Sequence, residues 1–487
     1  MSLSSTDTKQ GYLDWFSIAL FLGVICRLIA LGKEGLWLDE LTSLEIARLS
    51  ISDIVKGVGF DRHTPPAYYL ALHLWFKLLP SSEIGLRLFS AFFDILNVAL
   101  LFFLVRIRFS LVVAKYVTAL YALSSFAIYY AQEGRMYSML VCLVLLTHLL
   151  SEKLRDRPVW HNYLSLICVA VTGLYTHYYY ALSLVALFFS LISDAHRKRA
   201  FLLRWLITVG CAALLFTPWL EVISTLVGSG GQQFRQHAEL VLPYTLWRFV
   251  AGYALLPLGM GAKTEPLQLL AANWALVLSI GVVCSFTLIA ALFRLAREEN
   301  RRVLWLLINL LTVPVLAVLI SLKLPMLSER YLIVIFPFFL VLMALGLEGP
   351  KFGKRVLRVS FAGLWLTALA AYYFNPEYGK AEWRRAAARV VEEGTELDLV
   401  LVNPAFCKGL VSFYLPTPDK VGSYSQDQIH LGTTPLTLRE LPARIWLIES
   451  ADTASIEDKL LLTGYSKLKG EVFPKENGVR IALFARR

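Results

Sequence analysis

Long apolar runs recur along the first 375 residues of this chain, and they limit its fold more than any other feature. Several windows of about 18 or more residues carry few or no charges, which is enough to cross the roughly 30 Å hydrocarbon layer of a membrane as a helix. With 57% hydrophobic residues, 17% charged residues and a mean hydropathy of +0.59, the chain of 487 residues is too apolar for a soluble protein. Apolar runs and their breaks predict eleven spans, near residues 13–32, 86–106, 110–130, 136–152, 159–176, 178–193, 201–222, 268–293, 303–322, 331–348 and 355–374. We therefore expect a polytopic α-helical membrane protein.

The connections between these spans are alternately rich and poor in basic residues. The net charge of +11 by itself could suggest a nucleic-acid partner, but the positions of Lys and Arg indicate a membrane topology instead. The connections "RIRFSLVVAK", "SEKLRDR", "DAHRKRAFLLR", "FRLAREENRR" and "GPKFGKRVLR" are basic, whereas "QEGR", "THYYY" and "SLKLPMLSER" carry few positive charges. The pattern predicts a cytoplasmic N-terminus in a cytoplasmic (inner) membrane, with the first loop and the C-terminus facing the periplasm or the cell exterior. We expect the first span to be a retained anchor, because it lacks a convincing cleavage site.

The composition predicts two domains. Residues 1–375 form the membrane domain, which includes a long outer loop, 33–85, with helical periodicity, and a second outer segment near 223–267 that combines a Gly-rich loop with an aromatic helix. Residues 376–487 read as a soluble α/β domain on the outer side. Its expected helices are "AEWRRAAARVVEEG" and "SIEDKLLLTG", and its expected strands are "DLVLVNP", "RIWLIES" and "GVRIALFAR". Cys407 is the one cysteine of this domain, so no internal disulfide or zinc spacing is available there.

An acidic pair, Asp39 and Glu40, follows the first span directly. Asp39 could cap a helix that starts near Leu41, while Thr42 and Glu45 fit the spacing of a capping box. The alternative is a catalytic site, because other polar residues are expected on the same membrane face. These are Asp61, Arg62 and His63 before a Pro-Pro turn, Tyr68 in the helix after it, Glu133 and Arg135, His177, and Glu329 to Tyr331. Each could instead be an ordinary polar group at a helix end.

This set suits the transfer of a group away from a phosphate. One carboxylate, Asp39 or Glu133, could deprotonate an acceptor hydroxyl. Arg62, Arg135 and Arg330 could bind a phosphate, since a guanidinium makes paired contacts with its oxygens. A phosphate departs as a stable anion, so the second carboxyl group that a glycosidase uses to protonate its leaving group is not required.

The sequence resembles the membrane glycosyltransferases with the GT-C fold, the large group of bacterial relatives of protein O-mannosyltransferases and lipid A aminoarabinose transferase (glycosyltransferase family 39-like). The resemblance rests on "RLIALGKEGLWLDELTSLEIA", "HTPPAYYLALHLWF", "GLRLFSAFFD", "YYAQEGRMYSML", "THYYYAL" and "ERYLIVIFPFFL", in the family's order over about the first 350 residues. It implies an inverting transferase that moves a hexose or pentose from a polyprenyl-phosphate donor to a hydroxyl of a lipid, glycan or protein at the outer face.

The resemblance also implies roles for individual residues. Asp39 matches the family's catalytic base, Glu40 would orient it or bind sugar hydroxyls, and Glu133 would lie near the sugar. The donor phosphate would be bound by Arg62, Arg135, Arg330 and Tyr331, and the sugar or acceptor by Asp61, His63, Tyr68 and His177. Some family members have a Lys close to the phosphate, but its equivalent here is not evident from the sequence. A divalent metal at His63 and His177 is the less favoured alternative to sugar binding, because no spacing among these residues resembles a ligand set.

A polytopic lipid or solute transporter is the alternative interpretation. Transporters commonly show repeated halves and broken helices around charges at the middle of the membrane. Here the candidate charges lie at the outer ends of the spans and no repeat is evident, so the enzyme is favoured.

Overall fold

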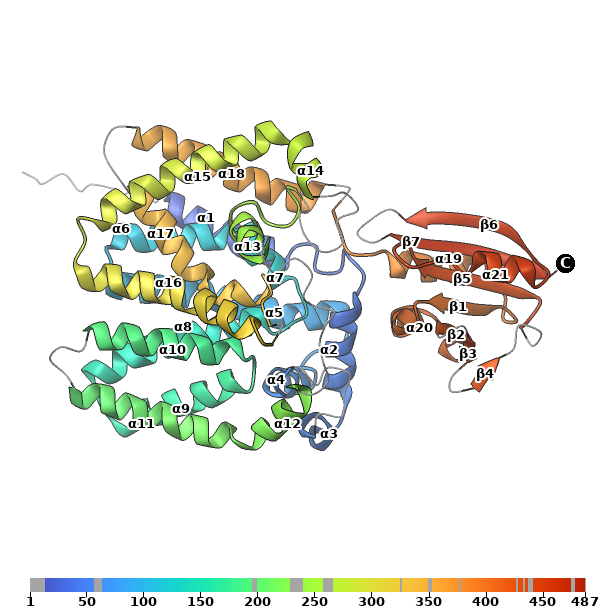
Figure 1. Cartoon of the computed structure of the whole chain (residues 1–487), viewed down its shortest axis with the longest axis horizontal. Helices are drawn as coiled ribbons and strands as arrows, with labels where there is room; N and C mark the ends of the chain where they lie inside the picture. The colour runs from blue at the N-terminus through green and yellow to red at the C-terminus, as the bar shows by residue number, and fades with distance from the viewer. Residues whose placement is uncertain are drawn as a thin grey trace, which may run out of the picture.

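The structure is a computed structural model that describes residues 14–56, 64–194, 199–227, 240–256, 266–324, 326–348, 353–375, 378–425, 428–431, 434–436, 441–473 and 478–486. A bundle of helices is followed by a separate sheet domain at one end of the molecule (Figure 1). The expected fold class, a polytopic helical membrane protein with a C-terminal α/β domain, is confirmed.

The first span and the outer loop form four helices, α1 (Trp15–Leu28), α2 (Leu38–Arg48), α3 (Ile51–Val55) and α4 (Ala67–Trp75). Asp14 caps α1 by accepting a hydrogen bond from the Ser17 N–H at 2.8 Å. The cap proposed for Asp39 is wrong: the N-cap of α2 is Trp37, and Asp39 lies in the first turn. There its negative charge faces the positive end of the helix dipole.

The bundle continues through fourteen more α-helices and one 3-10 helix in the described part of the chain. They are α5 (Glu83–Arg108), α6 (Leu111–Ala122), α7 (Ser125–Ala131), α8 (Tyr137–Asp156), α9 (Trp160–Leu174), α10 (Tyr179–Asp194), α11 (Arg199–Phe216), α12 (Pro218–Val227), α13 (Val241–Ala251), α14 (Pro266–Ala272), α15 (Trp274–Leu295), α16 (Asn300–Ser321), η3 (Tyr331–Ile335), α17 (Phe336–Glu348) and α18 (Lys354–Phe374). α13 is the helix expected in the second outer segment, whereas the Gly-rich stretch before it lies outside the described residues.

Seven of the described helical segments are long and apolar enough to cross a membrane: α5, α8, α11, α15, α16, α18 and the continuous segment Tyr331–Glu348. α6 and α7 together would make an eighth span, bent by 57°, and α1 and α10 are shorter apolar helices. Helices therefore occur at each of the eleven expected positions, while the number that cross the bilayer stays a prediction.

A buried ion pair joins three of these helices. Arg27 of α1 donates to Asp94 of α5 at 2.6 Å, and both side chains are almost fully buried. Arg27 also donates to the carbonyl oxygens of Gly23, Ala122 and Tyr121 at 2.8, 2.6 and 3.2 Å, so that α6 is held in the same network. α1 approaches α6 so closely that a Cβ at Gly23 would lie 2.7 Å from the Ala122 carbonyl oxygen.

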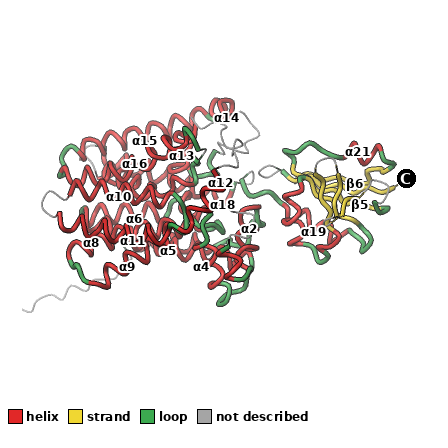
Figure 2. The backbone as a smooth tube through the Cα atoms, turned by 60° about the horizontal axis from the view of Figure 1, so that its bottom comes forward, coloured by secondary structure: helices red, strands yellow, loops and turns green. Residues whose placement is uncertain are grey.

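The C-terminal domain is a seven-stranded sheet with helices on both faces (Figures 1 and 2). The strand order is β4-β3-β2-β1-β5-β7-β6; β1 is parallel to β2 and β5, and the other pairs are antiparallel. The strands are β1 (Leu399–Asn403), β2 (Val421–Ser425), β3 (Gln428–Leu431), β4 (Thr434–Leu436), β5 (Arg444–Ser450), β6 (Tyr465–Phe473) and β7 (Val479–Arg486). The helices are α19 (Trp383–Glu393), η4 (Ala405–Cys407), α20 (Lys408–Tyr414), η5 (Pro418–Lys420) and α21 (Glu457–Leu462).

The predicted elements of this domain are confirmed as α19, β1, β5, α21 and β7. The sequence interpretation missed α20 and the strands β2, β3, β4 and β6. The middle of β6, "YSKLKGEVF", is exposed and includes Lys467 and Lys469, so the strand lacks the apolar run that identifies a central strand.

The first prediction concerns the ion pair inside the bundle. Asp94→Leu leaves the Arg27 guanidinium buried without a counter-ion, and we expect the free energy of unfolding to fall by about 3–5 kcal/mol. Unfolding in detergent measures this. Arg27→Met/Asp94→Leu removes both charges and should be more stable than the single variant; an equal loss in both would contradict the argument.

Candidate active site

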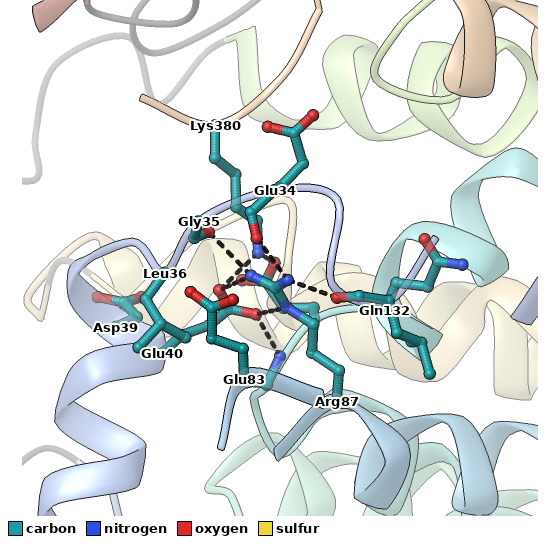
Figure 3. A network of polar contacts seen from close by, with 12 residues as sticks. Glu34, Gly35, Leu36, Asp39, Glu40, Glu83, Arg87, Gln132 and Lys380 are labelled. Carbon is teal, nitrogen blue, oxygen red and sulfur yellow. Dashed lines mark hydrogen bonds and ion pairs between the residues drawn. The ribbon is translucent and has the colours of Figure 1, made fainter. Parts of the chain in front are cut away.

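Glu40 is fully buried at the start of α2 and is held by Arg87 of α5. Two nitrogens of the guanidinium donate to the two carboxylate oxygens at 2.9 and 2.7 Å, which is the paired geometry that makes such contacts strong. The Gly134 N–H, from the connection between α7 and α8, donates to the same carboxylate at 2.9 Å. Three segments that are distant in sequence therefore meet at Glu40 (Figure 3).

Arg87 also organises loop 31–36, which joins α1 to α2. Its guanidinium donates to the carbonyl oxygens of Leu31, Glu34 and Gly35 at 2.6, 2.8 and 2.9 Å. A loop without repeating structure leaves its carbonyl groups unpaired, and here one buried side chain satisfies three of them. The position of α2, and so of Asp39, depends on this arrangement.

Lys380 reaches into the same place from the segment between α18 and α19. Its ammonium lies 2.8 Å from a Glu40 oxygen and 3.1 Å from a Glu133 oxygen. We call Glu40, Arg87, Glu133 and Lys380 the ion cluster. Two acids and two bases give it no net charge, which is the condition under which charges are stable when buried.

The two acids of the ion cluster are affected by burial in different ways. Burial raises the pKa of Glu40, but the charges of Lys380 and Arg87 outweigh burial and lower it to about 2. Burial also raises the pKa of Glu133. Here the opposing effect of the Lys380 charge is weaker than the effect of burial, so the pKa stays above its ordinary value. Glu40 is thus a fixed charge, and Glu133 is the acid of the pair that takes up a proton more readily.

Asp39 lies beside the ion cluster but faces outward. Its carboxylate is 3.1 Å from the Arg330 guanidinium, and the two side chains are 31% and 29% exposed. Trp37 lies between the two sites, with its ring centroid 5.5 Å from the Arg330 guanidinium carbon and 5.9 Å from the Lys380 nitrogen. Asp39 is therefore the accessible acid, paired with an accessible cation.

Arg135 and several aromatic residues lie next to this pair. Arg135 donates to the Ser43 hydroxyl at 3.1 Å and to the Asp39 backbone carbonyl at 3.3 Å, so it contacts α2 near the start of the helix. Tyr331 packs on His177 with ring centroids 4.7 Å apart, and the sequence predicted both as site residues. Arg248 of α13 forms an ion pair with Glu329, which ties the second outer segment to the residue before Arg330.

The structure brings together most of the residues that the sequence selected. Asp39, Glu40, Glu133, Arg135 and Arg330 gather around the first turn of α2. Two others, Tyr68 and His177, are buried. Tyr68 packs against Tyr69 and Phe89, and His177 packs against Tyr331, the residue after Arg330. Three further predicted residues, Asp61, Arg62 and His63, lie outside the described residues. The assigned roles stay predictions.

Two residues of the cluster were missed. Arg87 lies in "GLRLFSAFFD", which contributed to the resemblance, but a single Arg one turn into an apolar helix has no partner that the sequence identifies. Lys380 lies in "EYGKAEW" at the expected domain boundary, where a lysine is usually a solvated linker residue. An arginine at the outer end of an apolar span was the one available signal.

A small cavity of about 50 Å³ lies next to the ion cluster, and Asp39 is not among the residues that line it. Its wall includes Glu133, Lys380, Gln132 and the rings of Tyr129 and Tyr372. Within the described residues, no group of three or more His, Cys, Asp and Glu side chains could hold a metal ion.

The comparisons with known proteins concern the family and the fold. Residues 63–221, about a third of the chain, match the family model described as dolichyl-phosphate-mannose-protein mannosyltransferase. Two crystal structures of ArnT from Cupriavidus metallidurans share the fold. The form bound to undecaprenyl phosphate is 12% identical with a TM-score of 0.55, over 97% of this chain and 98% of its own, and the apo form is 12% identical with a TM-score of 0.54, over 96% and 97%. An oligosaccharyltransferase from Archaeoglobus fulgidus has a TM-score of 0.47 and 12% identity, over 82% of this chain and 63% of its own. No curated protein matches by sequence.

The fold comparison and the family match agree with each other. The chain has the GT-C fold seen in ArnT, and residues 63–221 are similar to the protein mannosyltransferases.

The second prediction follows from the low pKa of Glu40. Its folded value of about 2 lies below its ordinary value of 4.5, so its stabilisation is fully present above pH 4.5 and is lost as the pH falls through 2. Glu40→Gln should lower the free energy of unfolding by about 3 kcal/mol at pH 7 and by progressively less as the pH approaches 2. Unfolding in detergent across this range is the measurement.

Glu45→Gln, on the same helix, is the matched control. Burial raises the pKa of Glu45, so its replacement should not reproduce the loss at pH 7. A Glu40→Gln effect that is independent of pH would contradict the charge argument.

Proposed function

We propose that the protein is an inverting glycosyltransferase that moves a hexose or pentose from a polyprenyl-phosphate donor to an acceptor hydroxyl at the outer face of the membrane. The observation that carries this proposal is the contact of 3.1 Å between Asp39 and Arg330, both partly exposed, beside a buried and neutral ion cluster. A base and a phosphate-binding cation are the two groups that such a transfer requires.

The reaction needs only these two kinds of group. Asp39 takes the proton of the acceptor hydroxyl while the hydroxyl oxygen attacks the anomeric carbon from the face opposite the phosphate. The bond between that carbon and the phosphate oxygen breaks, and its electron pair stays on the departing polyprenyl phosphate. The single attack inverts the configuration. Arg330 stabilises the negative charge that develops on the phosphate.

Donor binding would also release the base. The Asp39 carboxylate and the Arg330 guanidinium form an ion pair with each other. A donor phosphate competes with Asp39 for the guanidinium, and the carboxylate is then free to accept a proton. Arg62, Arg135 and Tyr331 are further candidates for the phosphate, Glu40 and Glu133 for orienting the base and sugar, and Asp61, His63, Tyr68 and His177 for sugar or acceptor contacts. This mechanism assigns no step to a metal ion or cofactor.

The relatives support the carrier and the class of reaction. ArnT shares the fold and has been solved with undecaprenyl phosphate, and the matching family model is described by a dolichyl-phosphate-mannose donor. The basic connections support an inner-membrane protein whose site and C-terminal domain face the periplasm or the exterior. The acceptor would be a lipid, a glycan or a protein.

Release of free polyprenyl phosphate tests the function. Purified protein in nanodiscs would be given a panel of carrier-linked sugars, each with and without candidate acceptors. Release that depends on an acceptor identifies the sugar and supports the proposal. Binding of carrier-linked sugars without release under any acceptor, together with their movement across the bilayer, would favour the transporter.

The third prediction concerns the base. Asp39→Asn should lower turnover by at least about 100-fold, because general-base catalysis contributes about 10²–10⁴-fold, while donor binding is largely retained. Polyprenyl phosphate release and donor affinity are measured in parallel. Asp53→Asn, in the same outer loop, is the control. An active Asp39→Asn variant would remove Asp39 from this role.

The fourth prediction concerns the phosphate. Arg330→Ala should weaken undecaprenyl phosphate binding by about tenfold or more, since a hydrogen bond to a charged group contributes about 1.5–3 kcal/mol. The control is Arg302→Ala, whose side chain pairs with Glu298 and Glu299, the two residues just before its helix α16. Equal affinity in the two variants would assign the phosphate to other residues.

A further inference from the structure

The C-terminal domain contacts the loop that carries α2. Arg384 of α19 donates to the carbonyl oxygens of Gly32 and Lys33 at 3.0 and 2.5 Å, and it forms an ion pair with Glu83 at 2.9 Å. Together with Arg87, it therefore satisfies five successive carbonyl groups, those of residues 31–35. One of the two arginines belongs to the bundle and the other to the C-terminal domain.

A second contact lies at the end of the same loop. The Leu36 N–H donates to the Tyr414 hydroxyl at 2.7 Å, and that hydroxyl also hydrogen-bonds to Glu83. Helix α20, which contains Tyr414, packs against α2 so closely that a Cβ at Gly409 would lie 3.0 Å from the Leu41 side chain. The C-terminal domain thus contacts both the loop and the helix on which Asp39 lies.

Lys380 is the third contact and the one that enters the site. It lies three residues before α19 begins at Trp383. Its side chain is 13% exposed, and its ammonium lies between Glu40 and Glu133. Without it, two buried carboxylates would be left with one guanidinium, and like charges in a buried site repel. Glu40 is adjacent to Asp39, so a shift of Glu40 moves the proposed base.

We propose that the C-terminal domain completes the active site, with Lys380 as a positioning residue that holds Glu40 and Glu133 and so fixes the orientation of Asp39. The inference rests on the proposed function, because it assigns the domain a part in the same reaction. Lys380 acts through the two acids. Arg384 and Tyr414 seat the domain on loop 31–36.

Kinetics of matched variants test the role of Lys380. Lys380→Met should lower kcat by about tenfold to 100-fold, since small displacements of a reacting group cost rates of that order, while KM for the donor changes by less than about threefold. Lys380→Arg keeps the charge and should be closer to the wild type. Arg384→Met should also lower kcat, because it removes hydrogen bonds to loop 31–36.

Arg385→Met is the control for Arg384. Arg385 is the next residue of α19, but its contacts, with Glu382 at 3.0 Å and the ring of Phe473, stay within the C-terminal domain. If Lys380→Met and Arg384→Met have the same kcat as Arg385→Met, the proposal is overturned. A loss of undecaprenyl phosphate binding in Lys380→Met would overturn it too, because Lys380 would then bind the carrier directly.

A cross-link tests the seating of the domain without using activity. A Cβ at Gly35 would lie 3.1 Å from the Cβ of Arg384, so a shift of a few tenths of an ångström gives disulfide geometry. Gly35→Cys/Arg384→Cys should form a disulfide under mild oxidation, because Tyr414 and the packing of Gly409 against Leu41 keep the domain seated when Arg384 is replaced. A folded double variant that forms no disulfide overturns the seating. If the double variant forms the cross-link but the wild type transfers no sugar, the proposed function is contradicted and the seating stands.

Discussion

The buried pair of Glu40 and Arg87 is the interaction on which the outer part of the molecule depends. It joins the start of α2 to α5, and through Gly134 to the connection between α7 and α8. Each charge is stable in the interior only because the other is present. The same guanidinium satisfies the carbonyl groups of the loop before α2. The pair therefore converts an irregular loop into a fixed support for the acid that follows.

The neighbouring acids, Asp39 and Glu40, have different environments for a simple geometric reason. Successive residues of a helix point about 100° apart. When Glu40 faces the interior and is fully hydrogen-bonded, Asp39 faces outward toward Arg330. In the proposed mechanism, the fixed charge of Glu40 holds the start of α2 in place and Asp39 is the base.

The C-terminal domain is part of this arrangement even though it follows the last apolar helix, α18. One apolar cluster includes Leu41 and Leu44 of α2 together with Leu410 and Val411 of α20, so the contact is packed as well as polar. A domain that appears separate in outline (Figure 2) therefore shares a core with the outer loop. Its own sheet is a compact unit, with β1 and β5 at the centre.

The sequence by itself determined the class of fold and selected Asp39 and Glu40 as candidate site residues. Apolar runs predict helices because a bilayer requires paired backbone groups. The strands and helices of the tail follow from their periods of two and 3.6 residues. The partners of Glu40 were decided by tertiary structure. Arg87 and Lys380 lie 47 and 340 residues after Glu40 in the sequence. No local sequence pattern predicts which distant charges will meet. Long-range packing alone selects the counter-ions of a buried carboxylate, because its free energy depends on what surrounds it in space.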